Sequence, residues 1–163
     1  MAEILTDADI QRLLAETKPL PDNYQDRVRF KTKRGHKEAE VQVVGQSGAT
    51  FRLILRQSNL DALDFSVIVG YEAPTTNILF RLRRYNGKSH EHTNKLERQT
   101  FFDYHIHQAT QRYQEFGMSE DAFAEPTNRY ADVDSALQCA LQDCRFDLPP
   151  GAQLPLFSDG GSS

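Results

Sequence analysis

Two histidine pairs are the residues of this chain whose types and spacing suggest chemistry. Four of the five histidines fall in His-x-His pairs, namely His90 with His92 and His105 with His107. Side chains at i and i+2 of a β-strand point to the same face, so each pair brings two imidazoles together. Imidazoles bind divalent metals, and the second pair or Glu97 would complete the shell of the first. The pattern therefore predicts a metal site as one use of these four histidines.

The same histidines also suit a metal-free cleavage of phosphodiesters, in which no cofactor is needed. One histidine removes a proton from the attacking hydroxyl and another protonates the leaving oxygen, because an imidazole pKa of about 6.5 populates both states near neutrality. In this interpretation His105 and His92 form the acid/base pair, and His90 and His107 orient them. A third interpretation is a set of structural histidines that hydrogen-bond to Asp103, Thr93 or Asn94.

The elements that position these histidines follow from the hydrophobic period. Apolar residues with helical spacing predict a first helix over residues 7–17 and a last helix over residues 133–144, each preceded by a capping residue. Between them, alternation predicts strands near residues 28–30, 41–43, 51–55, 65–69, 78–82 and 102–106, and residues 108–116 look helical. We expect an α+β fold: an antiparallel sheet of five or six strands whose apolar face is covered by the N-terminal and C-terminal helices.

Strand parity also relates the two histidine pairs to each other. With Phe102, Tyr104 and Ile106 pointing into the core, residues 105 and 107 project on the opposite face. A chain reversal near residues 94–99 would return residues 90 and 92 against them. The four histidines are therefore expected to form one cluster.

Basic side chains are concentrated in the middle of the chain. Residues 27–98 carry 14 Lys and Arg against 7 Asp and Glu, whereas the whole chain has a net charge of −4. The parity that buries the apolar residues places eight basic side chains together on the other sheet face: Arg27, Arg29, Lys31, Lys33, Arg52, Arg56, Arg81 and Arg83. Such a face predicts binding of nucleic-acid phosphates with a steep salt dependence, and a solvated basic surface is the alternative. Arg81 or Arg83 is expected to stabilise charge during catalysis.

Length and composition limit the class of protein. The 163 residues suffice for one core, which we expect over residues 1–148. No apolar run approaches the roughly 20 residues of a membrane-spanning helix, and the start lacks a basic segment followed by an apolar one, so we expect a cytoplasmic protein without membrane contact. The two cysteines are too few for a disulfide framework.

Three motifs resemble a group of small bacterial proteins of unknown function, often found in mobile or phage-derived DNA. The motifs are Tyr85-Asn86-Gly87-x-x-His90-x-His92-Thr93-Asn94, then Phe102-x-x-His105-Ile106-His107, then Ala124-Glu125-Pro126-Thr127 with Tyr130. The resemblance covers roughly residues 78–146. It implies that the histidines act as a unit and implies no particular activity.

A second resemblance lies in residues 149–163, where proline, glycine and serine predict a flexible tail. The segment Gln153-Leu154-Pro155-Leu156-Phe157 is similar to the Gln-Leu-x-Leu-Phe pentapeptide by which bacterial proteins bind the DNA sliding clamp. The resemblance implies that Leu156 and Phe157 fill an apolar pocket of the clamp while Gln153 bonds to its rim. The alternative is that the apolar residues fold back on the domain.

Together these features predict a protein directed to nucleic acid. The leading hypothesis is a histidine-dependent phosphodiesterase or ribonuclease, of the toxin, defence or mobile-element type, whose tail binds the sliding clamp. The alternative is a non-catalytic phage or mobile-element protein that binds a replication or defence component. A metalloprotein acting on a small anion is a third hypothesis.

Overall fold

The computed structural model describes residues 3–150. Its helices are α1 (Asp7–Ala15), α2 (Tyr24–Arg27), α3 (Gln111–Glu115) and α4 (Val133–Asp143). Its longer strands are β3 (His36–Val44), β4 (Thr50–Ser58), β5 (Phe65–Glu72) and β6 (Leu79–Asn86). The short strands are β1 (Lys18–Pro19), β2 (Lys31–Thr32), β7 (His92–Asn94), β8 (Gln99–Phe101), β9 (His105–Gln108), β10 (Phe123–Pro126) and β11 (Phe146–Asp147).

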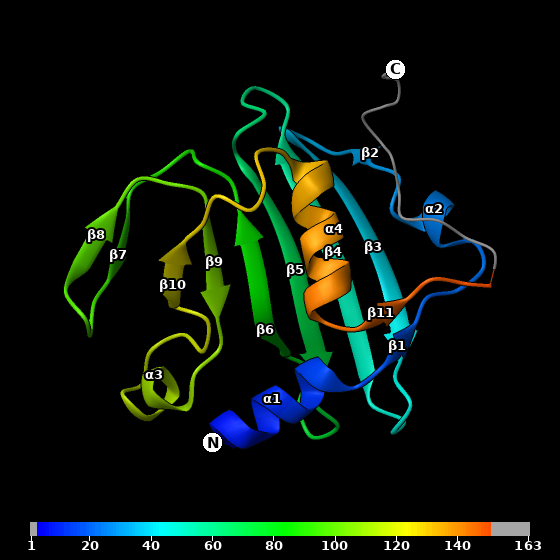
Figure 1. Ribbon diagram of the computed structural model, residues 1–163, viewed down its shortest axis with the longest axis horizontal. Coiled ribbons are helices and arrows are strands. Elements are labelled where there is room, and N and C mark those ends of the chain that lie inside the picture. Colours follow the sequence, from blue (N-terminus) through cyan, green and yellow to red (C-terminus); the bar gives the residue numbers. More distant parts are fainter. Residues whose placement is uncertain (1–2, 151–163) are drawn as a thin grey trace.

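The main sheet has seven antiparallel strands in the order β10-β9-β6-β5-β4-β3-β2 (Figure 1). The predicted α+β class is confirmed. The predicted count of five or six strands was wrong, because the edge strands β2 and β10 have only two and four residues, too few to show an alternating pattern. The β7–β8 hairpin leaves the main sheet between β6 and β9 and forms a separate two-stranded sheet.

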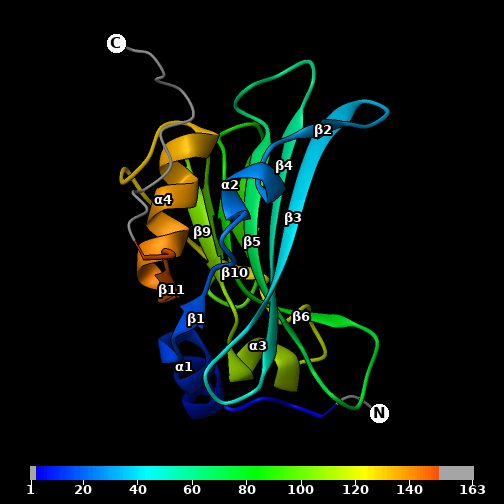
Figure 2. The same cartoon turned by 90° about the vertical axis from the view of Figure 1, so that its right-hand side faces the viewer.

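Helices α1 and α4 lie on the same side of the main sheet (Figure 2). Asp132 caps α4, and the apolar stripe of this helix is buried on β5 and β6: Val133, Ala136, Leu137, Ala140 and Leu141. Helix α1 begins with a capping box at Thr6 and buries Ile10, Leu13 and Leu14. The opposite face carries neither α1 nor α4, and α3 lies at the end of the sheet below β9 and β10 (Figure 1); we call this opposite face the helix-free face.

A buried lysine joins the two ends of the described chain. Lys18 is fully buried, and its Nζ shares its three hydrogens among four backbone oxygens, those of Leu13, Leu14 and Glu16 at the end of α1 and that of Cys144 at the end of α4. These oxygens belong to helix ends that lack intrahelical partners. The parallel pairing of β1 with β11 reinforces the junction.

The expected strand at residues 28–30 is absent from the structure. The chain forms α2 there instead, because Tyr24 and Val28 are both buried at helical spacing. Arg27 therefore lies on a helix, and Arg29 pairs with Asp26 at 3.5 Å. The expected alignment of these two arginines with Lys31 and Lys33 on one strand was wrong.

Two expectations concern the chain as a whole. Within residues 3–150, no helix is long and apolar enough to cross a membrane. The clamp-binding segment, with Gln153, Leu154, Leu156 and Phe157, lies outside the described residues. Its role stays a prediction from sequence.

An ion pair that fastens α4 gives a test of the fold. Arg129 donates to both carboxylate oxygens of Asp143 at 2.9 Å, and the Tyr85 hydroxyl donates to the same carboxylate at 2.7 Å. Burial opposes ionisation of Asp143, but these hydrogen bonds outweigh it and keep the pKa of the carboxyl below its ordinary value. The resulting stability is present above the unfolded pKa of about 3.9 and is lost as pH falls through the folded value.

We therefore expect Asp143→Asn to lower the free energy of unfolding by about 1–3 kcal/mol at neutral pH. In urea denaturation at neutral and at acid pH, the difference from wild type should narrow at the acid pH, because the wild-type carboxyl takes up a proton as pH falls through its folded pKa. Asp147→Asn, at an exposed position on β11, is the matched control. An equal loss of stability at both pH values would contradict the assignment.

Candidate metal centre

Strand β9 contributes two histidines to the helix-free face of the sheet. It lies between β6 and β10, with His107 opposite Arg84 and Ala124, and Ile106 opposite Tyr85. Ile106 is buried in the core, so His105 and His107 point the other way. The predicted parity is confirmed for residues 105–107, whereas Phe102, which was expected in the core, precedes the strand and is 52% exposed.

The β7–β8 hairpin brings a third histidine over this face. The chain reverses after Asn94, and the His92 ring lies 5.2 Å from that of His105 and 4.8 Å from that of His107, measured between centroids. Asn94 is fully buried and fixes the hairpin: its Nδ2 donates to the Ala124 oxygen at 2.7 Å, and its Oδ1 accepts from the Ala124 nitrogen at 2.9 Å. The predicted approach of the first histidine pair to the second is therefore correct for His92.

Hydrogen bonds set the protonation of each imidazole. His105 Nδ1 lies 2.7 Å from the backbone oxygen of Asp103, and His107 Nδ1 lies 2.7 Å from that of Asp121. His92 Nε2 lies 2.7 Å from Oδ1 of Asn94, whose amide is already oriented by Ala124. An oxygen can only accept, so each of these nitrogens must donate, and the other nitrogen of a neutral ring carries a lone pair.

The three histidines can together hold a metal ion. Ligand nitrogens of His92, His105 and His107 all lie within 4.8 Å of one another. Ligand atoms of a tetrahedral zinc site stand about 3.4 Å apart at bond lengths of about 2.05 Å, so small ring rotations bring them onto one ion. Outer hydrogen bonds from the second ring nitrogen are the usual support of such ligands. Three histidines leave a fourth position open, as in catalytic rather than structural zinc sites.

Buried charges surround the cluster. Asp121 is 1% exposed, and its carboxylate pairs with Arg84 at 3.0 Å and with Arg81 at 3.3 Å. Burial, followed by the charge of Arg84, lowers the pKa of His107 to about 2. Burial also lowers the pKa of His105, against the effect of its hydrogen bond to Asp103. Both rings are therefore neutral at pH 7, which is the form that binds metal.

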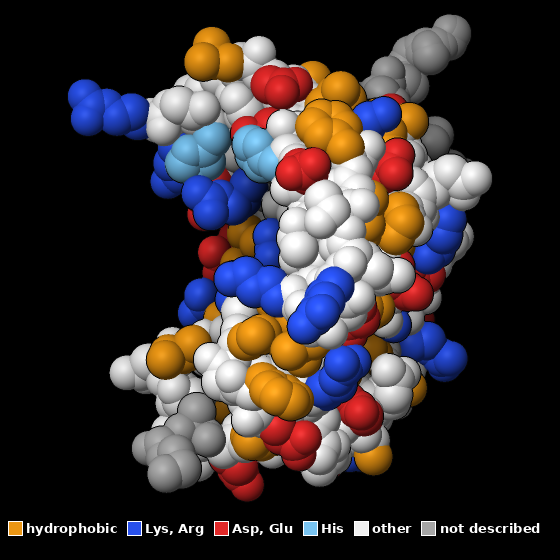
Figure 3. Space-filling model, turned by 90° about the vertical axis from the view of Figure 1, so that its left-hand side faces the viewer, with side chains coloured by type: hydrophobic (Ala, Val, Ile, Leu, Met, Phe, Trp, Pro, Cys, Tyr) orange, Lys and Arg blue, Asp and Glu red, His pale blue; other side chains and the backbone are white. Residues whose placement is uncertain are grey.

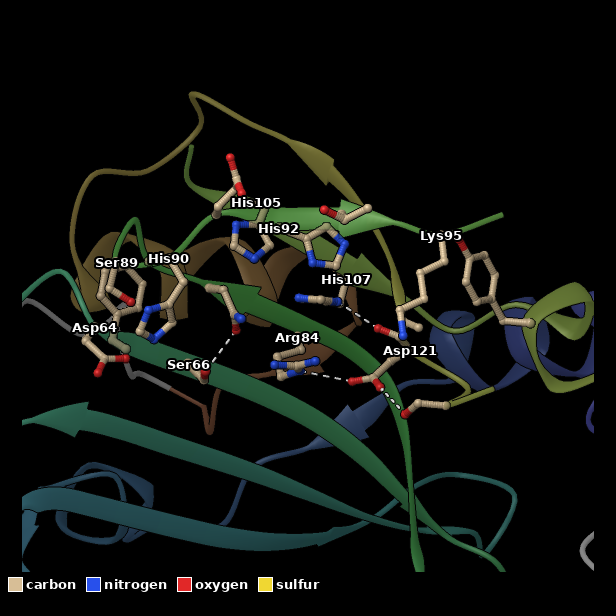
Figure 4. Close-up of a pocket in the computed structure, with 18 of the residues that line it drawn as sticks. Asp64, Ser66, Arg84, Ser89, His90, His92, Lys95, His105, His107 and Asp121 are labelled. Atoms are coloured by element: carbon tan, nitrogen blue, oxygen red, sulfur yellow. Dashed lines mark hydrogen bonds and ion pairs between the residues drawn. The ribbon is translucent and has the colours of Figure 1, made fainter. Parts of the chain in front are cut away.

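The cluster lines one wall of a cavity of about 520 Å³. Arg84 and Lys95 approach from one side, and Asp64, Ser66 and His90 from the other (Figure 4). On the surface, histidine side chains lie beside Lys and Arg side chains (Figure 3). A small anionic group could thus reach the three imidazoles and a guanidinium together.

The remaining predicted site residues are separated from the triad. His90 lines the cavity but is exposed and is not one of the three clustered ligands. Glu97 bonds to Arg112 and to the Tyr113 hydroxyl instead of joining the metal shell.

Arg83 lies on the wrong side of the sheet for the predicted catalytic role. A β-bulge opposite Val69 and Gly70 reverses the parity of β6, so Arg83 pairs across to core positions and its charge acts on buried Cys144. The neighbouring Arg84 enters the cavity in its place.

The expected basic face is present in the middle of the sheet, but carboxylates neutralise it there. Three arginines do point to the helix-free face, but each has a carboxylate partner. Arg52 pairs with Glu72 at 2.6 Å, Arg56 with Glu38 at 3.8 Å, and Arg81 with Glu120 at 3.3 Å. Four members of the predicted set have no carboxylate partner among the described residues: Arg27, Lys31, Lys33 and Arg83. Of these, Lys31 and Lys33 lie toward the end of the β2–β3 hairpin.

Sequence reasoning missed Arg84 and Asp121, and it named Asn94 only as a hydrogen-bond partner of structural histidines, a contact that the structure contains. Arg84 was overlooked because a bulge has no signature in the alternation of apolar residues. Asn94 and Asp121 act through contacts with Ala124 and His107, which lie 30 and 14 residues away in the sequence. An asparagine two residues after His92 was the available signal for an outer hydrogen bond.

The triad predicts binding of one Zn²⁺ per chain, measured by isothermal titration and by metal analysis of dialysed protein. His105→Gln and His107→Gln should each reduce zinc to less than about a tenth of wild type, because two histidines rarely retain a site. His90→Gln and His36→Gln should leave the stoichiometry at one. Circular dichroism controls for folding, and retention of zinc in folded His107→Gln protein would refute the triad.

The role of Asn94 gives a separate prediction. Asn94→Ala should weaken zinc binding about 10–100-fold, because His92 loses the oxygen that orients it. It should also lower the free energy of unfolding by about 1–3 kcal/mol, because the buried peptide groups of Ala124 lose their partners. Thr93→Ala, which removes an exposed hydroxyl contact with Thr100 on the same hairpin, is the control. Unchanged zinc affinity in Asn94→Ala would show that His92 needs no such support.

Comparison with protein-family models, with curated proteins and with solved structures gives no significant match. The resemblance of residues 78–146 to bacterial proteins of mobile DNA therefore stays a prediction. A functional proposal for this chain rests on the geometry of the three histidines and their cavity.

Proposed function

We propose that the protein is a divalent-metal-dependent phosphodiesterase that acts on nucleic acid. The observation that carries the proposal is the convergence of His92, His105 and His107, each held by an outer hydrogen bond with its other nitrogen free. Arg84 stands beside them in the same cavity. A metal with an open position next to a guanidinium is suited to a phosphate group.

The geometry favours this chemistry over the metal-free acid/base pair of His92 and His105. Their rings are stacked, with an angle of 19° between the planes and 5.2 Å between centroids, which leaves no room for a phosphate between them. A general acid must also carry a proton on the nitrogen that faces the substrate. In both rings the proton is engaged by an oxygen of the protein.

Each residue around the cavity then has a defined task. A divalent ion would supply a Lewis acid and lower the pKa of a coordinated water. Arg84, held by Asp121, donates to a non-bridging phosphate oxygen and neutralises the charge that develops there. Lys95 adds a second positive charge at the rim, and His90, which is exposed and outside the triad, protonates the leaving oxygen.

The assay measures hydrolysis of bis(4-nitrophenyl) phosphate and of labelled RNA and DNA, with zinc-loaded, manganese-loaded and chelator-treated protein. Cleavage should require metal and be lost in His107→Gln. Arg84→Gln should lower kcat about 100-fold while zinc content stays at one per chain, because the guanidinium acts on the transition state. Partial recovery in Arg84→Lys would separate lost charge from lost structure.

Two outcomes would overturn the proposal. One is folded, metal-loaded wild type that cleaves none of these substrates, which would favour the non-catalytic interaction protein. The other is cleavage that persists in chelator and depends on His92 and His105, which would restore the metal-free mechanism.

A further inference from the structure

A row of polar residues crosses the helix-free face of the sheet from the metal centre to the far edge. Directly opposed residues of neighbouring strands point to the same face. The row follows from the register of six strands and consists of His105, Asn86, Ser66, Arg56, Glu38 and Lys31. With neighbouring strands about 4.8 Å apart, it spans about 24 Å.

Two hollows follow this row and join. The cavity at the metal centre is continued by a second hollow of about 280 Å³, lined by His36 and Arg56 among others. Both hollows share Asp64, Phe65 and Ser66 as lining residues. The two hollows therefore adjoin between the histidine triad and the β2–β3 hairpin, and we call the pair of them the groove.

The groove ends at a hairpin with concentrated positive charge. Lys31, Lys33 and Arg34 are exposed and have no carboxylate partner among the described residues, and Gly35 turns the chain with φ of 81°. The hairpin projects beyond the sheet on the side away from α4 (Figure 2). This is the same side of the sheet as the metal centre.

We infer that this groove binds a single-stranded nucleic acid, with one phosphate at the metal centre and others on the hairpin of residues 31–37. The inference rests on the proposed function, and it names the form of the substrate and its path. A span of about 24 Å corresponds to roughly seven nucleotides at the stacked spacing of 3.4 Å, and to fewer in an extended strand.

Burial of the metal ligands favours a single strand over a duplex. His105 and His107 are only 5% and 4% exposed, so a phosphate must enter the cavity to reach them. A single strand bends easily into such a recess. A duplex, with a persistence length of about 50 nm, would lie across the rim.

Acidic residues along the groove give a second test of how the nucleic acid binds. Glu38 is engaged by Arg56 at 3.8 Å and by His36 at 3.1 Å. Asp64 lies where the two hollows meet, so its carboxylate would face the bound backbone. Removal of its charge should therefore tighten binding, whereas removal of hairpin charge should weaken it.

The test is fluorescence anisotropy with chelator-treated full-length protein and labelled RNA and DNA single strands of 12 and 4 nucleotides, with a 12-base-pair duplex for comparison. We expect the 12-nucleotide strand to bind more tightly than the 4-nucleotide strand and the duplex. Lys33→Gln/Arg34→Gln should weaken its binding about tenfold and reduce the salt slope by about 1.4, since each phosphate contact contributes about 0.7. Asp64→Asn should strengthen its binding a few-fold.

The matched control is Arg12→Gln/Arg145→Gln, which removes the same charge on the side of α1 and should leave binding unchanged. Equal effects of the two double variants, or preference for the duplex, would overturn the inference. Hydrolysis of bis(4-nitrophenyl) phosphate by wild type is measured in parallel. Binding that depends on the hairpin, without any hydrolysis, would support the proposed path of the strand and refute the proposed catalysis. Hydrolysis together with binding that does not depend on the hairpin would support the catalysis and refute the path.

Discussion

The alternation of side chains along β9 is the constraint on which the site depends. Ile106 must enter the core beside Tyr85, and this alone sends both neighbouring histidines to the other face. A shift of one residue would bury two imidazoles among apolar side chains and place Ile106 in the cavity. The register is fixed by strands on both sides. The Tyr130 hydroxyl also contributes from the core side, because it shares its one hydrogen between the backbone oxygens of His105 and Asn86.

The third histidine comes from a hairpin that the main sheet does not contain, so its position depends on one side chain. Asn94 bonds to both peptide groups of Ala124 on β10 and presents its oxygen to His92. The same amide therefore docks the hairpin and selects which imidazole nitrogen faces the cavity. Rigid strands and a buried amide hold the three ligands in advance of any ion, which reduces the entropy that binding must overcome.

The sequence predicted the structure correctly where a single hydrophobic periodicity determines which side chains are buried. The stripe of α4, the parity of His105 and His107, and the return of His92 all follow from local spacing and a short reversal. Prediction failed where contacts between distant residues determine the local structure. Because of the bulge in β6, Arg84 and not Arg83 enters the cavity. Because Tyr24 and Val28 are buried, the chain forms α2 in place of the expected strand. The carboxylates that neutralise Arg52 and Arg56 could not be assigned without the strand register.

The buried Lys18 also bears on when the chain can complete its fold during synthesis. One of its acceptors, the backbone oxygen of Cys144, is separated from it by 126 residues. Before that acceptor is in place, the ammonium group can reach only the three oxygens at the end of α1, and its shortest contact, 2.6 Å to Cys144, is missing. The native surroundings of Lys18 are therefore complete only after translation has passed residue 144, so the junction between α1 and α4 cannot close on a shorter nascent chain.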